Sequence, residues 1–308
     1  MMAKPLIIDT DPGIDDAAAI TLLVDEPAFD IKLIASVSGN VGIGHTTNNA
    51  LKLLTFLGRR IPVARGAAAP LMRDNRFATE AHGKSGMGSF EFPEPDNSLL
   101  TANNAVLEER QVLMESTEPV TILTLGPLTN IALLLATFPE VKSHIERIVS
   151  MGGSTERGNI GVYGEFNISV DPEAAKMVFR SGLPITMVGL DIGRKAHLVA
   201  NDLDALEASG EVGKMVSSLF RSYDGGHIEE GIKMYDPSAA MVLIEPELFT
   251  MRSAFVDVEI SSPITLGATA VDYDGILSEE KNLDVCVDVD VDGFRKSFVD
   301  RAARVQRQ

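Results

Sequence analysis

Four aspartates stand within eight residues near the start of the chain, in the stretch DTDPGIDD. They are Asp9, Asp11, Asp15 and Asp16. Carboxylates this close repel one another unless shared protons or a cation neutralise them. No cysteine and few histidines lie nearby, and hard oxygen donors of this kind suit both Ca²⁺ and Mg²⁺. The cluster predicts a divalent cation site, and a solvated acidic loop is the simpler alternative.

The flanking residues predict the elements that would bring these aspartates together. The apolar run PLII predicts a buried strand, Pro12-Gly13 predicts a tight loop, and AAAITLLV predicts a helix whose first turn holds Asp15 and Asp16. Loops at the carboxyl ends of strands form the ligand sites of open α/β sheets. We therefore expect all four aspartates to converge on one crevice.

Further strand-like runs alternate with helical stretches along the chain. The runs are IKLIASVSGN, IPVARG, VTILTLG, RIVSMGG and ITMVGLD. Several of them end on polar residues or glycines, namely Asn40, Gly66, Gly126, Gly152-Gly153 and Asp191. The alternation predicts an α/β fold with an open, mostly parallel central sheet flanked by helices, a Rossmann-like core. We expect a single domain over residues 1–308, with a site assembled from distant strand ends.

Two segments outside these runs are candidates for covering the site. Residues 73–98 are rich in Gly, Pro and charge, and they predict a long loop of the kind that is often functional. Residues 221–240 contain Gly225-Gly226, which offers a hinge. A mobile cover and an ordinary helix connection are both compatible with this second segment.

Composition narrows the classes of partner and the compartment. The formal net charge of −17 makes nucleic-acid binding improbable, because that affinity rests on Lys and Arg. It also disfavours multiply phosphorylated substrates. The lone Cys286 suits a reducing compartment. Neither a basic-then-apolar leader nor an apolar run of transmembrane length is recognisable, so we expect a cytoplasmic protein with no membrane partner.

Other acidic motifs fit the chain less well. An EF-hand that starts at Asp9 requires an acidic residue or Asn at its fifth position and Glu at its twelfth, where this chain has Gly13 and Ile20. A phosphatase of the haloacid dehalogenase type expects Thr or Val where Gly13 stands. Near the C-terminus, DVDVDG (288–293) also imitates an EF-hand, but the alternating LDVCVDVDV predicts a strand with one polar face.

Seven motifs in one order carry a family resemblance across nearly the whole chain. They are DTDPGIDDA, SGN (38–40), HGKSGMG (82–88), LGPLTNIALLL (125–135), MGGSTERGN (151–159), EFNISVDPEAA (165–175) and DPSAAM (236–241). With these motifs the sequence resembles the inosine-uridine nucleoside hydrolase family, and most of all its bacterial broad-specificity ribonucleoside hydrolases. The resemblance implies a Ca²⁺-dependent N-ribohydrolase that acts in purine and pyrimidine salvage or catabolism.

The resemblance also implies a metal site and a mechanism. Asp11, Asp16, Asp236 and the backbone carbonyl of Leu125 would hold Ca²⁺, which binds the ribose 2′- and 3′-hydroxyls and one water. Asp11 would be the general base for attack of that water on the anomeric carbon, with inversion. A pocket rich in carboxylates would stabilise the oxocarbenium-like transition state.

Residues for substrate binding are implied in the same way. Asp15 and Asn40 would lie near the 2′-hydroxyl, and Met151 beside the sugar. Asn159, Glu165 and Asn167 would bind the 3′- and 5′-hydroxyls. His82 and Tyr223 would contact the nucleobase. Taken alone, Asn40 and Asn159 are typical turn residues, and His82 is as readily structural. If their segment is extended, Glu165 and Asn167 share one face.

One position departs from the family pattern. Many members have a His before the last metal-binding Asp, as proton donor to the leaving base, and this chain has Tyr235. Three hypotheses follow: His227 replaces the acid, pyrimidine nucleosides are preferred, or the leaving group needs no proton. A Mg²⁺-dependent phosphohydrolase and an inactive Ca²⁺-stabilised riboside-binding protein remain alternative functions. The family also implies a homo-oligomer, a dimer or a tetramer.

Overall fold

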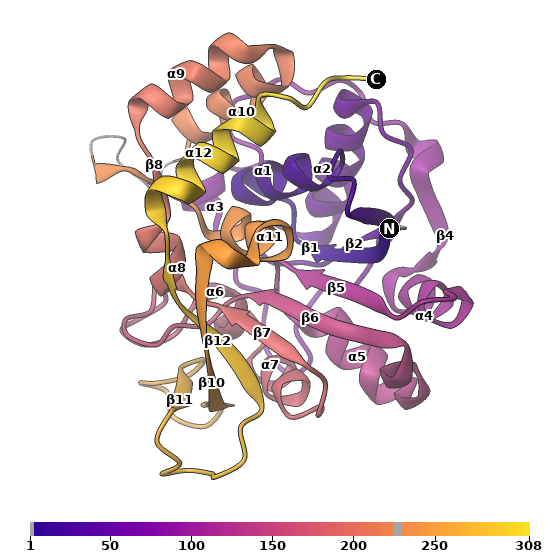
Figure 1. Cartoon of the computed structure of the whole chain (residues 1–308). Helices are drawn as coiled ribbons and strands as arrows, with labels where there is room; N and C mark the ends of the chain where they lie inside the picture. Colours follow the sequence, from indigo (N-terminus) through magenta and orange to yellow (C-terminus); the bar gives the residue numbers. More distant parts are fainter. Residues whose placement is uncertain (1–2, 224–229) are drawn as a thin grey trace.

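A ten-stranded sheet forms the centre of the computed structural model, which describes residues 3–223 and 230–308 (Figure 1). The strand order is β11-β10-β12-β7-β6-β5-β1-β2-β3-β4. Strands from β4 to β12 in this order run parallel, and β10 runs antiparallel to both β12 and β11. The predicted α/β fold with a mostly parallel sheet is confirmed. The bounds are β1 Lys4–Thr10, β2 Phe29–Ser36, β3 Val63–Arg65, β4 Leu100–Asn104, β5 Val120–Thr124, β6 Ile145–Met151, β7 Ile185–Val188, β10 Phe249–Val258, β11 Thr269–Asp272 and β12 Leu283–Val289.

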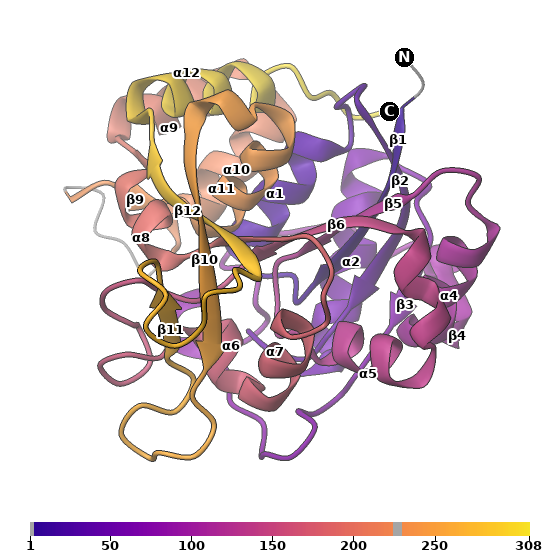
Figure 2. The ribbon, with the colours of Figure 1, turned by 60° about the horizontal axis from the view of Figure 1, so that its bottom comes forward.

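Helices cover both faces of the sheet and enclose two apolar cores. The first face is covered by α1 (Ile14–Leu23), α2 (Ile43–Leu57), α8 (Leu190–Lys195), α9 (Ala200–Ser209), α10 (Glu211–Arg221), α11 (Tyr235–Ile244) and α12 (Val291–Ala302). The second face is covered by α4 (Ala105–Glu115), α5 (Thr129–Thr137) and α7 (Pro172–Phe179) (Figure 2). Short helices α3 (Thr79–His82) and α6 (Phe166–Val170) and a small sheet of β8 (His197–Leu198) and β9 (Ile232–Lys233) complete the structure.

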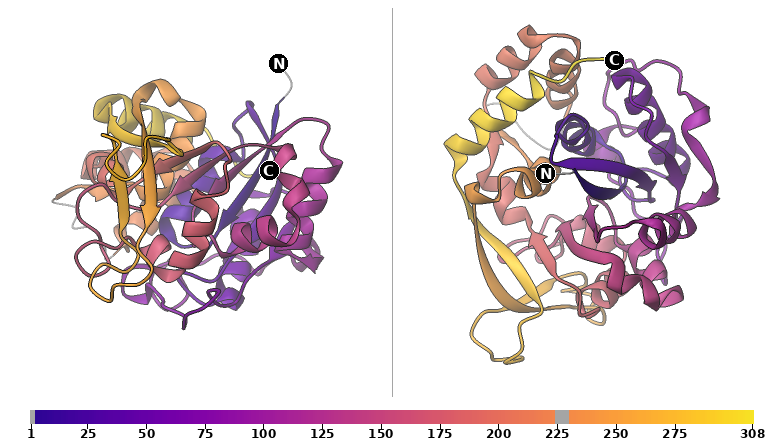
Figure 3. Two further views of the ribbon diagram at one scale, coloured as in Figure 1. Left: turned by 90° about the horizontal axis from the view of Figure 1, so that it is seen from below. Right: turned by 45° about the vertical axis from the view of Figure 1, so that its right-hand side comes forward.

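All six predicted apolar runs form strands, namely β1, β2, β3, β5, β6 and β7. The first seven residues of LDVCVDVDV form β12, which confirms the strand prediction over the EF-hand. The Asp290 side chain then caps α12 by accepting from the Gly293 N–H at 3.1 Å. The sequence did not predict β4, β10 or β11. Figure 3 shows β10 and β12 as orange and yellow strands at one end of the molecule, away from β1.

The central strand β1 positions the site, because it lies between β2 and β5 where the strand order changes direction. Open α/β sheets bind ligands in the crevice at the carboxyl end of such a switch point. Residues 11–13, 37–42 and 125–128 leave β1, β2 and β5 at this edge. The sheet takes strands from residue 4 to residue 289, and the single domain over residues 1–308 stays a prediction.

Two predictions fall beyond what the structure describes. The proposed hinge Gly225-Gly226 and the alternative acid His227 lie outside the described residues. Among the helices of the described ranges, none is long and apolar enough to cross a membrane.

Candidate active site

The aspartate loop follows the predicted order of strand, turn and helix. Strand β1 ends at Thr10, and α1 begins after Gly13 with Asp15 and Asp16 in its first turn. The Gly13 N–H donates to Asp16 Oδ2 at 2.8 Å, and the Thr10 hydroxyl donates to the other oxygen, Oδ1. These bonds satisfy an open N–H group at the helix start and fix the Asp16 carboxylate at the crevice.

Asp11 is buried between two glycine-containing turns. Its Oδ2 accepts a hydrogen bond from the Asn40 N–H at 2.6 Å, and its Oδ1 has no hydrogen-bond partner among the described residues. A Cβ at Gly39 would lie 2.0 Å from Oδ2, and one at Gly126 would lie 2.7 Å from Oδ1. Only glycine leaves room for this carboxylate at both positions.

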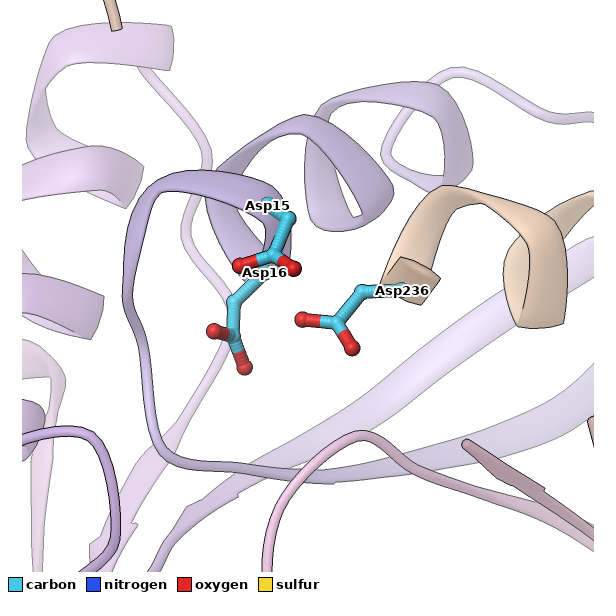
Figure 4. A group of neighbouring side chains, drawn as sticks. All are labelled: Asp15, Asp16 and Asp236. Carbon is cyan, nitrogen blue, oxygen red and sulfur yellow. The ribbon is translucent and has the colours of Figure 1, made fainter. Parts of the chain in front are cut away.

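Asp236, in the first turn of α11, brings a carboxylate from the other end of the chain. Ligand oxygens of Asp15, Asp16 and Asp236 lie within 4.8 Å of one another, and Figure 4 shows the three side chains around one space. Burial and the charges of Asp15, Asp16 and Asp11 raise the pKa of Asp236 well above its ordinary value. Burial and the Asp16 charge raise the pKa of Asp11 in the same way.

These residues fit a divalent cation. Burial and mutual repulsion make it costly for these neighbouring carboxyl groups to ionise, which is why their pKa values are raised. A cation bound among the carboxylates would offset that cost. The Asp11 Oδ1, without a partner among the described residues, is an available hard donor at this place. The three carboxylates whose oxygens lie within 4.8 Å of one another include Asp15, whereas the ligands implied by the resemblance include Asp11. The two sets share Asp16 and Asp236.

The expectation that Asp9 joins this crevice is wrong. Side chains alternate along a strand, so Asp9 points to the face opposite Thr10. There its Oδ2 accepts from the Asn130 side chain at 2.7 Å, and Glu109 of α4 lies beside it. Burial raises the Asp9 pKa to about 7. Asp9 therefore supports the loop from behind the sheet.

A cavity of about 410 Å³ opens above the carboxylates. It is lined by eleven of the residues that the sequence singled out: Asp15, Asn40, His82, Leu125, Met151, Asn159, Glu165, Asn167, Tyr223, Tyr235 and Asp236. Asp11 and Asp16 are not among the lining residues, and both are fully buried. The structure thus brings segments from distant regions of the chain to one cavity.

Glu165 and Asn167 reach the cavity from a helix start, so the condition of an extended segment is not met. Glu165 caps α6 and accepts from the N–H groups of Asn167 and Ile168 at 2.9 and 3.1 Å. Burial raises its pKa to about 7. The Asn167 side chain donates to the Leu125 carbonyl at 2.7 Å. This bond ties the Asn167 side chain to the backbone of Leu125, so both residues are held at the cavity wall.

His82 and Tyr223 form another part of the cavity wall. Their ring centroids lie 5.3 Å apart. The backbone N–H of Ile14 donates to His82 Nδ1 at 3.2 Å, and burial lowers the His82 pKa to about 4. The imidazole is therefore neutral at physiological pH, with its proton on Nε2.

Tyr235 is half-buried beside Asp236 and packs against the backbone of Gly193. A Cβ at Gly193 would lie 2.2 Å from Tyr235 Cδ1. Burial raises the Tyr235 pKa, while the neighbouring Arg194 guanidinium opposes this effect. The phenol thus keeps its proton at neutral pH and can donate a hydrogen bond into the cavity.

Sequence reasoning missed several residues of the cavity wall. They are Phe77, Ala78, Thr79, Glu80, Ala81, Ile160, Phe166 and Leu190. Five of them precede His82 within the long loop that the composition predicted, so adjacency to His82 was a usable signal. The loop contains only the four-residue helix α3 and the first residues of a 3₁₀ turn. By contrast, Asp191 accepts a hydrogen bond from Thr155 and is not among the lining residues.

Comparison with known proteins agrees with this geometry. The model of the family described as inosine-uridine preferring nucleoside hydrolase matches residues 6–296. The chain belongs to this family. Nucleoside hydrolases break N-glycosyl bonds, and this nucleoside hydrolase is a hydrolase of that class.

Curated relatives and solved structures resemble this nucleoside hydrolase over almost its full length. It is 49% identical to the non-specific ribonucleoside hydrolase RihC of Salmonella typhimurium over 94% of this chain and 95% of that protein. It is 47% identical to RihC of Escherichia coli over 96% and 97%. The purine-preferring ribonucleoside hydrolase from Gardnerella vaginalis superposes with a TM-score of 0.91 at 30% identity, over 98% of this chain and 99% of that one.

Proposed function

We propose that this nucleoside hydrolase is a Ca²⁺-dependent N-ribohydrolase that releases the base from ribonucleosides by direct attack of water. The observation that carries the proposal is the group of buried carboxylates at the floor of a nucleoside-sized cavity. The similarity to ribonucleoside hydrolases described as non-specific supports a broad choice of base.

Asp11, Asp16, Asp236 and the Leu125 carbonyl would hold the cation, with Asp15 beside them. A bound divalent cation would supply positive charge that keeps these carboxylates ionised and makes nearby water more acidic. The oxygen donors suit Ca²⁺ and Mg²⁺, and the family resemblance favours Ca²⁺.

Asp11 is the general base of the proposed reaction. Its Oδ1, which has no partner among the described residues, accepts a proton from the attacking water, whose oxygen forms the new bond to the anomeric carbon. The bond from that carbon to the base breaks as the base departs with the electron pair. Because the attacking group is water and no enzyme group bonds to the sugar, the anomeric centre inverts.

The remaining floor residues bind the ribose. Asp15, Asn40, Asn159, Glu165 and Asn167 all line the cavity, so ribose hydroxyls can donate to the Asp15 and Glu165 carboxylates. Met151 offers an apolar contact beside it. These carboxylates also stabilise the positive charge that develops on the ribose in the transition state.

Three residues of the cavity wall, His82, Tyr223 and Tyr235, contact the nucleobase in this proposal. His82 presents a neutral Nε2–H group and Tyr235 a protonated phenol, and each can donate a hydrogen bond to the departing base. Tyr223 adds an aromatic face beside His82. Tyr235 stands where many relatives have His, so we propose that it shifts the preference among leaving groups.

The proposed assembly and location follow from the resemblance and the composition. The family implies a homo-oligomer, and the charge and the lone cysteine support a cytoplasmic enzyme of nucleoside salvage or catabolism.

The experiment that tests the proposal is chromatography of the base released from inosine, adenosine, guanosine, uridine, cytidine and nicotinamide riboside, with proton NMR of the first ribose anomer. We expect base release and initial formation of the α-anomer from these β-ribosides. Initial β-anomer would contradict direct attack of water, and release from none of the substrates would leave a binding role.

A further inference from the structure

The turn that carries His82 is fastened to the aspartate loop by a residue outside the cavity. Asn49, on α2, is almost fully buried. Its side-chain amide donates to the Pro12 carbonyl at 2.9 Å and to the Ser85 carbonyl at 2.8 Å. The two acceptors belong to two segments that are distant in sequence and that meet where the Ile14 N–H donates to His82 Nδ1.

Each acceptor is close to a functional side chain. Pro12 follows Asp11 directly. Ser85 lies inside a turn that closes on itself, because the Gly88 N–H donates to the His82 carbonyl at 3.1 Å. A shift of the Pro12 or the Ser85 carbonyl would therefore change the distance between Asp11 and His82.

The packing around this amide is tight. A Cβ at Gly86 would lie 2.8 Å from Asn49 Nδ2, and Gly86 has a φ of +89°, a conformation that favours glycine. An amide is needed because it offers two N–H donors in one plane, whereas a hydroxyl offers one. Losing the amide would leave the buried Pro12 carbonyl without this donor and would release the Ser85 carbonyl from the aspartate loop.

We propose that Asn49 is a positioning residue for nucleoside hydrolysis. It holds the turn that carries His82 in place relative to the aspartate loop. The inference rests on the proposed function in one respect, the placement of the base beside His82. Asn49 is not a lining residue of the cavity, so it acts through the turn 82–88, which it fastens to the aspartate loop.

The test compares substrates whose leaving groups differ in how much they need a hydrogen bond from His82. Inosine and uridine use that hydrogen bond, whereas p-nitrophenyl β-ribofuranoside has a leaving group that departs as a stable anion. For Asn49→Ala we expect kcat/KM on the two nucleosides to fall by about 10²-fold, as for other small misplacements of reacting groups. The fall on the nitrophenyl riboside should be at least about tenfold smaller.

A double-mutant cycle with His82→Ala shows whether Asn49 acts through His82. In the His82→Ala background we expect Asn49→Ala to change nucleoside hydrolysis by less than about twofold, because the wall it positions is already lost. Equal losses on all substrates, or additive losses in the cycle, would overturn the proposal and leave Asn49 a purely structural residue.

A control on the same helix separates positioning from stability. The Thr55 hydroxyl accepts from the Asp96 N–H at 2.8 Å, so it fastens the far end of the same long segment. Thr55→Val should lower thermal stability without changing the ratio of nucleoside to nitrophenyl hydrolysis. If Asn49→Ala does not fold, Asn49→Ser, which keeps one donor, carries the same comparison. A wild-type enzyme inactive on every riboside would refute the proposed function, not the role of Asn49 alone.

Discussion

The His82 imidazole accepts a hydrogen bond from the backbone N–H of Ile14, at 3.2 Å from Nδ1. Ile14 is the first residue of the helix that carries Asp15 and Asp16, so this bond joins His82 directly to the aspartate loop. It also fixes the tautomer, because a nitrogen that accepts cannot hold the proton of a neutral ring. The geometry thereby makes His82 a neutral hydrogen-bond donor.

His82→Ala is expected to lower kcat/KM on inosine and uridine by about 10²-fold, the loss typical of one donor aimed at developing charge. Because the His82 pKa is about 4, the rate of the wild type should show no His82 titration between pH 5.5 and 8. Steady-state kinetics over this range check both statements. A limb of the pH profile near 6.5 that disappears in His82→Ala would contradict a neutral imidazole.

Tyr235→His is expected to raise hydrolysis of substrates with poorly departing bases relative to the others, by up to the roughly 10²–10⁴-fold that a matched general acid provides. Imidazole transfers a proton at neutral pH more readily than a phenol whose pKa burial has raised. The measurement is the ranking of kcat/KM over the six ribosides. An unchanged ranking would show that this position does not set the preference.

Gly39→Ala should abolish most activity, because a Cβ there would lie 2.0 Å from Asp11 Oδ2 and displace the proposed general base. Gly44→Ala, in α2, is the matched control. A methyl group added at Gly44 would meet no described atom within 4 Å, so alanine there should stabilise the helix by about 0.5–1 kcal/mol. Activity and thermal melting of both variants check this pair. Full activity in Gly39→Ala would mean that Asp11 is free to move.

Glu109→Gln should stabilise the protein at high pH. Burial and the charge of Asp9 raise the Glu109 pKa well above 4.5, so the folded state holds a proton that the unfolded chain releases. This favourable contribution is complete below pH 4.5 and is lost as pH rises toward the folded pKa, at about 1.4 kcal/mol per pH unit. Melting curves should show the variant gaining on the wild type from pH 5 to 8. Glu115→Gln on the exposed face of α4 is the control, and parallel curves would contradict the raised pKa.

The aspartate loop could be predicted from sequence because its signals are local. An apolar run, Pro12-Gly13 and an apolar helix with acidic residues in its first turn specify strand, loop and helix in order, and the structure has them. The parallel arrangement followed from the alternation of strands and helices. The place of Asn40 followed from its position at the end of a strand-like run. The convergence of Glu165 and Asp236 rested on the family motifs, since their separation in the chain carries no local signal.

The errors have equally specific causes. Asp9 was assigned to the crevice by proximity in sequence, although the alternation of a strand sends it to the other face. Glu165 starts a helix because its carboxylate accepts from N–H groups of that helix, a capping pattern that the alternation of Glu165 and Asn167 hides. The wall residues Phe77 to Ala81 are mostly small or apolar and showed no chemistry of their own.

The most direct test of the central claim is base release by protein stripped of metal with a chelator and then supplied with Ca²⁺ or Mg²⁺. If Asp11, Asp16 and Asp236 hold a cation that the reaction needs, stripping should abolish release of base from inosine and uridine, and Ca²⁺ should restore it. A stripped, metal-free protein that releases base at the original rate would contradict the account.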